Sequence, residues 1–126
     1  MKQLLKTIIF LLIINQLAAQ QFYVSKAGTD ANKGTAQKPV ATLQKAQTLV
    51  RDFKKANPSY TGDITVTVMP GTYELTSSLS FNKGDAGNEN IQVIWKAAEK
   101  NKVILSGGKN INGRLFKKVT NSSILA

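Results

Sequence analysis

Between residues 42 and 56, apolar positions recur every three or four residues, the spacing of one helix face. Thr42 is a suitable N-cap, and Asn57-Pro58 disfavours continuation of a helix. The pattern therefore predicts an amphipathic helix from about Thr42 to Ala56, whose apolar stripe packs against a core. The stripe consists of Leu43, Ala46, Leu49, Val50 and Phe53.

From Asp63 onward the hydrophobic period changes from helical to two, which is typical of strands with one buried face. Residues 64–68 alternate between aliphatic side chains and threonine. In a third strand pattern, Ile91, Val93 and Trp95 alternate with the polar residues Gln92 and Lys96. Polar, turn-rich segments over residues 28–39 and 83–90 read as loops. Shorter apolar runs predict further strands at residues 22–24, 73–81, 103–105 and, less clearly, 111–116.

One helix followed by short strands and polar turns is compatible with more than one architecture. The strands fit irregular coils of a β-solenoid, in which each turn contributes short strands to stacked sheets. An ordinary α+β domain or a small sandwich fits the same pattern. Composition and period do not separate these alternatives.

The first 19 residues have the layout of a secretory signal peptide. Lys2 and Lys6 form a short positive region, residues 8–14 form an apolar region, and Ala18-Ala19 supplies small residues. We expect cleavage after Ala19, so that a secreted or periplasmic protein begins at Gln20 or Gln21. Residues 20–126 then form one domain.

A retained membrane anchor is the alternative interpretation of this segment. The apolar run is about half of the roughly 20 residues that a spanning helix needs, and Asn15-Gln16 interrupts it. These features favour export with cleavage, and we expect no membrane span afterwards.

The chain contains neither cysteine nor histidine, which narrows its chemistry. Disulfides, cysteine metal sites and Ser-His-Asp triads are excluded. The formal net charge is +10, of which Lys2 and Lys6 contribute two units. Because the lysines are scattered and not interleaved with aromatic residues, they indicate a solvated basic surface and no nucleic-acid partner.

Asp30, Asn32 and Gly34 match the start of a calcium-binding loop, D-x-N-x-G. An EF-hand loop needs a carboxylate at its twelfth position, which here is Ala41. The match therefore fails, and turn stabilisation is the favoured interpretation. A different calcium site, shared with a neighbouring loop, stays as the alternative.

Asp85 and Glu89 are a close carboxylate pair in a turn-rich loop, and glycosidases use two carboxylates. No neighbouring group would keep one of them protonated, so turn chemistry is again favoured. Tyr23, Tyr73 and Trp95 could stack on sugar rings, but their places within strand patterns favour packing. The sequence therefore predicts no catalytic, cofactor-binding or metal-binding residue.

Several short blocks follow one another at fitting distances. They are YVS at 23–25, GTD at 28–30, GT at 34–35, Pro39, ATLQKA at 41–46, VTVMPGTY at 66–73, GDAGNEN at 84–90 and VILSGG at 103–108. As an ordered set they resemble the N-terminal region of secreted right-handed parallel β-helix proteins, the pectate-lyase-like superfamily. The resemblance covers about residues 22–126.

The resemblance implies a mainly β fold, in which one amphipathic helix caps the first coils of a right-handed parallel β-helix. Members are usually much longer and carry their catalytic residues on later coils, so the chain looks truncated. It implies an N-terminal fragment of a secreted polysaccharide-degrading protein, the parent being a glycoside hydrolase or a polysaccharide lyase. The fragment would be structural, would meet polysaccharide only through its parent, and would self-associate through its open end. The alternative is a stand-alone, non-catalytic carbohydrate-binding or adhesive surface module.

Overall fold

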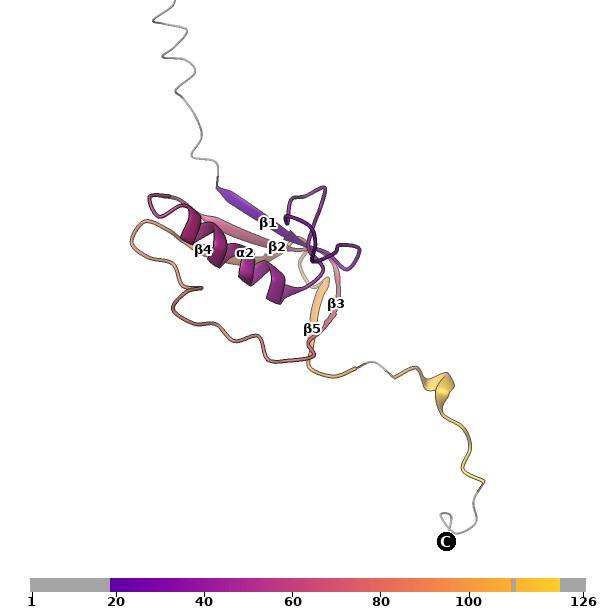
Figure 1. The fold of residues 1–126 in the computed structure, drawn as a ribbon. Helices are drawn as coiled ribbons and strands as arrows, with labels where there is room; N and C mark the ends of the chain where they lie inside the picture. Colours follow the sequence, from indigo (N-terminus) through magenta and orange to yellow (C-terminus); the bar gives the residue numbers. More distant parts are fainter. Residues whose placement is uncertain (1–18, 110, 121–126) are drawn as a thin grey trace, which may run out of the picture.

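The fold begins with a parallel strand–helix–strand unit, and its strands are arranged in two small sheets (Figure 1). The computed structural model describes residues 19–109 and 111–120, so all of the predicted signal peptide except Ala19 lies outside the described residues. The elements are β1 (Gln20–Val24), α2 (Leu43–Ala56), β2 (Ile64–Val68), β3 (Gly71–Glu74), β4 (Val93–Ala97), β5 (Val103–Ser106) and the 3-10 turn η1 (Gly113–Leu115).

The strands pair in parallel throughout. A three-stranded sheet has the order β1-β2-β4, and a two-stranded sheet joins β3 to β5. In the larger sheet Phe22 lies opposite Val66, which in turn lies opposite Trp95. In the smaller sheet Gly71 lies opposite Val103. Parallel neighbours need crossover connections, and α2 provides the crossover from β1 to β2.

The core lies between α2 and one face of the larger sheet. Phe53 of α2 places its ring edge-on to Phe22 of β1, with 6.2 Å between ring centroids. The same helix buries Leu43, Ala46 and Val50. The buried apolar residues of the whole cluster are Phe22, Val24, Val40, Leu43, Ala46, Val50, Ile64, Val66, Val68, Tyr73 and Ile91.

The predicted fold class is wrong. The chain does not form a mainly β cap with the first coils of a right-handed parallel β-helix; it forms a small α/β fold. Among the described residues neither sheet closes or curls, because one contains three strands and the other only two. The helix covers a sheet face and contributes to the main core, so it is a layer of the fold. The strand pattern specifies short strands but leaves open how they are distributed between sheets.

The predicted helix is confirmed almost to the residue. The Thr42 hydroxyl oxygen accepts a hydrogen bond of 3.1 Å from the backbone N–H of Lys45, as an N-cap should. At the other end the Asn57 N–H donates to the Phe53 carbonyl, 3.0 Å away. No helix among the described residues is long and apolar enough to cross a membrane.

The predicted strands are confirmed at four places and corrected at two. All five residues of β2 are buried, although the sequence indicated one exposed face. Thr65 lies between Gln21 and Ile94, so longer side chains on both neighbouring strands shield it. Of the predicted 73–81 strand region only the start belongs to β3, and residues 111–116 contain an exposed 3-10 turn in place of a strand.

Candidate functional site

The connection between β3 and β4 is fastened to α2 by a two-pronged ion pair. Arg51 donates from Nε to Oδ1 of Asp85 and from Nη2 to Oδ2, each over 2.6 Å. Asp85 is only 5% exposed, so its carboxylate is held inside the structure. Paired guanidinium and carboxylate groups in this geometry are stronger and more directional than a single charged hydrogen bond.

Further hydrogen bonds shape the loop around Asp85. The backbone N–H of Asn82 donates to Oδ2 of Asp85 over 2.8 Å, and the Asp85 N–H donates to the Asn82 carbonyl over 2.9 Å. Lys54 reaches across from α2 and donates to the carbonyls of Gly84 and Ala86. Helix and loop are therefore linked by side chains from two successive turns of α2.

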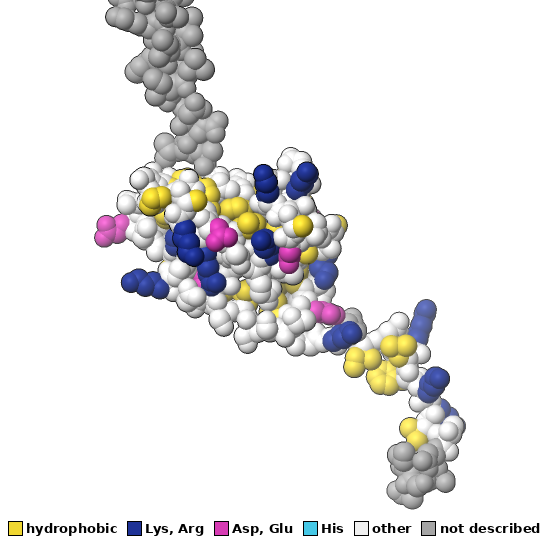
Figure 2. All heavy atoms as spheres, in the orientation of Figure 1, with side chains coloured by type: hydrophobic (Ala, Val, Ile, Leu, Met, Phe, Trp, Pro, Cys, Tyr) yellow, Lys and Arg dark blue, Asp and Glu magenta, His cyan; other side chains and the backbone are white. Residues whose placement is uncertain are grey.

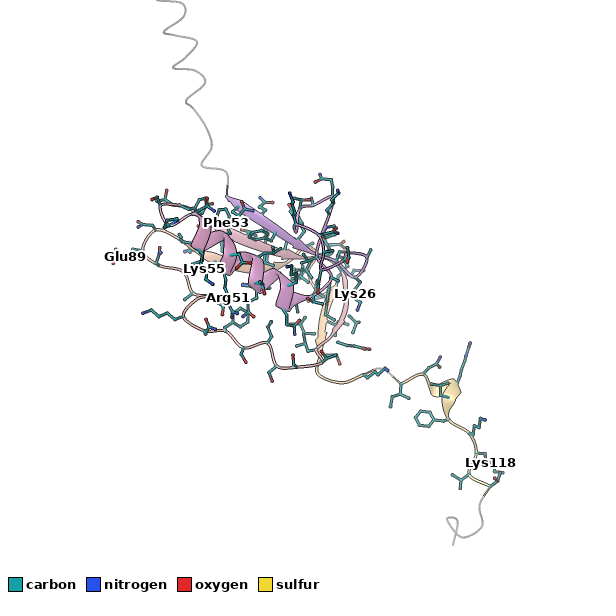
Figure 3. The ribbon with its side chains drawn as sticks, in the orientation of Figure 1. Lys26, Arg51, Phe53, Lys55, Glu89 and Lys118 are labelled. Carbon is teal, nitrogen blue, oxygen red and sulfur yellow. The ribbon has the colours of Figure 1, made fainter. Side chains whose placement is uncertain are left out.

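This arrangement determines what Asp85 can do chemically. The hydrogen bonds from Arg51, reinforced by the Asn82 N–H, lower the pKa of the Asp85 carboxyl despite its burial. A carboxyl of lowered pKa is a poor proton donor at neutral pH. Glu89 is exposed and makes none of these hydrogen bonds to Asp85, and Figure 3 shows it apart from Arg51. Asp85 is thus bound to Arg51 as a carboxylate and does not fit the role of the acid in a catalytic pair.

A shallow hollow of about 390 Å³ lies beside this ion pair. Its walls are Arg51, Lys54, Lys55, Asn82 and Gly84. Two of these cations are already engaged, one by Asp85 and the other by backbone carbonyls. Lysines in the last turn also suit the negative end of the helix dipole. In Figure 2 basic and acidic side chains lie close together on this face, which fits a structural role for these charged residues.

The Asp30 loop closes on the start of α2. Oδ1 of Asp30 accepts from the backbone N–H groups of Ala41 and Thr42, both over 2.9 Å, and Oδ2 accepts from the Thr42 hydroxyl over 2.7 Å. The Asn32 side chain donates to the Pro39 carbonyl over 2.8 Å. These contacts support turn stabilisation. Among residues 19–109 and 111–120, no group of three or more potential metal-ligating side chains occurs.

The three aromatic residues singled out from the sequence have different surroundings. Tyr73 is buried, and its hydroxyl donates to the Met69 carbonyl over 2.9 Å. Burial raises the pKa of the Tyr73 phenol. Tyr23 donates to the Gln21 side chain. Trp95 is half-buried and meets Phe81 edge-on, with 5.5 Å between ring centroids.

Strands β4 and β5 form an open edge, by which we mean their sides facing away from β2 and β3. Within the described part of the chain, each pairs with a neighbour on one side only. Gln92 accepts from the Ile64 N–H and Ala98 donates to the Val68 carbonyl, so alternate residues of this segment bond to β2. The backbone groups of Val93, Trp95 and Ala97 therefore point outward.

Apolar side chains accompany this open edge. Phe81, Ile104 and Leu105 are 55%, 57% and 53% exposed. A groove of about 250 Å³ runs beside them, with almost entirely apolar walls. Its lining residues are Leu43, Val68, Leu79, Phe81, Trp95, Lys96, Ala97, Val103 and Leu105. The sequence pattern predicted a strand at Phe81, and no local signal marks this groove because its walls come from five separate parts of the chain.

Comparison with known proteins relates this fold to a carbohydrate-active enzyme. No protein-family model matches the chain, and no curated protein matches it. A solved structure described as a glycoside hydrolase superimposes with a TM-score of 0.72 and 32% sequence identity. The superposition covers 81% of this chain but only 17% of that chain. The protein is therefore similar to a short part of a glycoside hydrolase and spans about a sixth of its length.

Proposed function

We propose that this chain is the N-terminal portion of an exported carbohydrate-active protein, most simply a glycoside hydrolase, and that the portion itself is structural. The main support for this proposal is the similarity, at 32% sequence identity, to a segment of a much longer glycoside hydrolase. Export is proposed from the positive, apolar and small-residue regions of residues 1–19. A polysaccharide lyase parent has no support beyond the sequence resemblance.

A structural role agrees with the carboxylates of the described residues. Asp85 is committed to Arg51, and Asp30 is committed to the start of α2. A glycosidase needs one carboxyl that stays protonated and another a few ångströms away, roughly 5–10 Å. Asp85, whose pKa is lowered by Arg51, does not fit the role of the protonated carboxyl, so catalysis would belong to other parts of the parent protein.

The open edge is where such a parent would continue. Unpaired strand edges readily accept a further strand, and apolar walls beside them provide side-chain burial. Since the matched glycoside hydrolase has about five-sixths of its length outside the superposition, further polypeptide is the occupant that the comparison favours. Strand addition would satisfy the outward backbone groups of β4 and cover Phe81 and Leu105.

The proposal is tested by sequencing the DNA downstream and by measuring enzyme activity. The DNA downstream of this reading frame is read in all frames, and the longest product is expressed with and without residues 20–126. We expect activity on a polysaccharide panel, scored by reducing ends, from the long product only, and no activity from residues 20–126 alone. Downstream DNA that encodes an unrelated protein, together with sugar binding by residues 20–126, would overturn the proposal in favour of a stand-alone binding module.

A further inference from the structure

The backbone nitrogen of Gln20 has an unusual set of acceptors. It lies 3.0 Å from the carbonyl oxygen of Asp63 and also 3.0 Å from the hydroxyl oxygen of Tyr60. The Tyr60 hydroxyl in turn donates to the same Asp63 carbonyl over 3.1 Å. A peptide nitrogen carries one hydrogen, so a single donor is shared between two well-placed acceptors.

Both acceptors are fixed by the surrounding fold. The Tyr60 ring packs edge-on against Phe53 of α2, with 4.9 Å between centroids. The turn that follows is pinned by the Gly62 N–H, which donates to the Asn90 carbonyl over 2.8 Å. Gly62 has φ +122°, a left-handed conformation that a side chain would strain. The two oxygens are thus held in place before any ligand arrives.

Space is available where the preceding residue lies. A hollow of about 310 Å³ lies beside Ala19, the residue before Gln20, and we call it the amine pocket. Its lining residues are Ala19, Tyr60, Thr61, Gly62 and Asp63. Removing the residues up to Ala19 would open this hollow and convert the Gln20 nitrogen into an ammonium group with three hydrogens.

We propose that the amine pocket is a binding site for the chain's own α-ammonium group at Gln20, produced by cleavage after Ala19. Each acceptor then receives its own hydrogen, and the third hydrogen faces solvent in the opened hollow. Hydrogen bonds from a charged donor are about twice as strong as neutral ones. The site fits a chain that begins at Gln20 and not one that begins at Gln21, because the nitrogen of Gln20 is the one that bonds to the Asp63 carbonyl at the start of the β1–β2 ladder. The inference rests on the proposed export for its cleavage step.

The test sets the N-terminus in vitro, so that its outcome does not depend on secretion. Three proteins are released from a removable tag to begin at Ala19, Gln20 or Gln21, and their thermal unfolding is compared. We expect the protein that begins at Gln20 to melt several degrees above the other two. Equal melting temperatures for the Ala19 and Gln20 forms would overturn the proposal. Whether cells cleave after Ala19 is a separate measurement, made by N-terminal sequencing of the exported protein.

A second measurement uses the chemical reactivity of the N-terminal amine of Gln20. A free N-terminal glutamine cyclises when its neutral amine attacks its own side-chain amide carbon, forming a C–N bond and releasing ammonia. An ammonium group held by Tyr60 and Asp63 is withheld from this reaction. Tyr60→Phe keeps the ring against Phe53 but removes one acceptor, so we expect ammonia loss, followed by mass spectrometry, to become several-fold faster. Tyr23→Phe is the matched control, because the Tyr23 hydroxyl donates to the Gln21 side chain and lies on the same strand as Gln20. Identical rates in the two variants would contradict the proposed site.

Discussion

Arg51 on α2 forms an ion pair with Asp85, 34 residues later in the sequence. This pair holds the irregular connection between β3 and β4 against the helix. Gln47, one turn earlier on the same helix, adds a hydrogen bond of 2.9 Å to the Ser80 carbonyl. The connection between β3 and β4 contains no strand or helix, so these side chains supply the order that backbone ladders supply elsewhere. Their removal is therefore a direct test of how the fold is held together.

Asp85→Asn should destabilise the protein by about 1–3 kcal/mol, the usual range for a charged hydrogen bond left unmade in a buried setting. The amide keeps the shape of the side chain but presents an NH₂ group to one prong of Arg51. The free energy of unfolding in urea measures the loss. Asp52→Asn, an exposed carboxylate on the same helix, is the control and should change it by less than about 0.5 kcal/mol. Equal losses in the two variants would mean that the ion pair contributes nothing specific.

The same ion pair should make stability depend on pH on the acid side. The pKa of Asp85 is lower in the folded protein than the value of about 3.9 for an unperturbed aspartate. The stabilisation that the ionised Asp85 gives the folded protein is therefore complete above the pKa of the unfolded chain. It is lost as the pH falls through the lower pKa of the folded protein. We expect the stability difference between the wild type and Asp85→Asn to be constant from about pH 7 to pH 5 and to shrink towards about pH 2. A difference that grew on acidification would contradict the lowered pKa.

Phe53 joins the helix to both β1 and the amine pocket, since its ring meets Phe22 and Tyr60. Phe53→Ala should cost about 3 kcal/mol, the lower end of the range for emptying an aromatic site, because the side chain is only partly buried. Urea or thermal unfolding measures this loss. Phe116→Ala is the matched control, because Phe116 is exposed beside η1. A neutral result at Phe53 would show that the helix stripe does not depend on this ring.

The sequence predicted those parts of the fold that local patterns encode. The helix stripe, the Thr42 cap and the existence of strand β2 each depend on residues a few positions apart. The sheet arrangement was mispredicted because β2 pairs with β4 and β3 pairs with β5, and nothing in a short strand specifies its partner. Likewise the sequence singled out Asp85 as a turn residue, but its partner Arg51 could not be identified, since two single charges far apart in sequence have no local signature.

The open edge should make residues 20–126 self-associate when expressed alone, through outward backbone groups flanked by Ile104 and Leu105. Leu105→Lys places a charge on this edge, and charged edge residues are a common protection against strand pairing. We expect sedimentation over a concentration series to show association of the wild type and a shift of the variant towards monomer. Leu115→Lys is the matched control: it makes the same change at a more exposed leucine outside β4 and β5, and should leave association unaltered. A wild type that stays monomeric at every concentration would show that the edge is stable without a partner, and would weaken the case for a continuing parent chain.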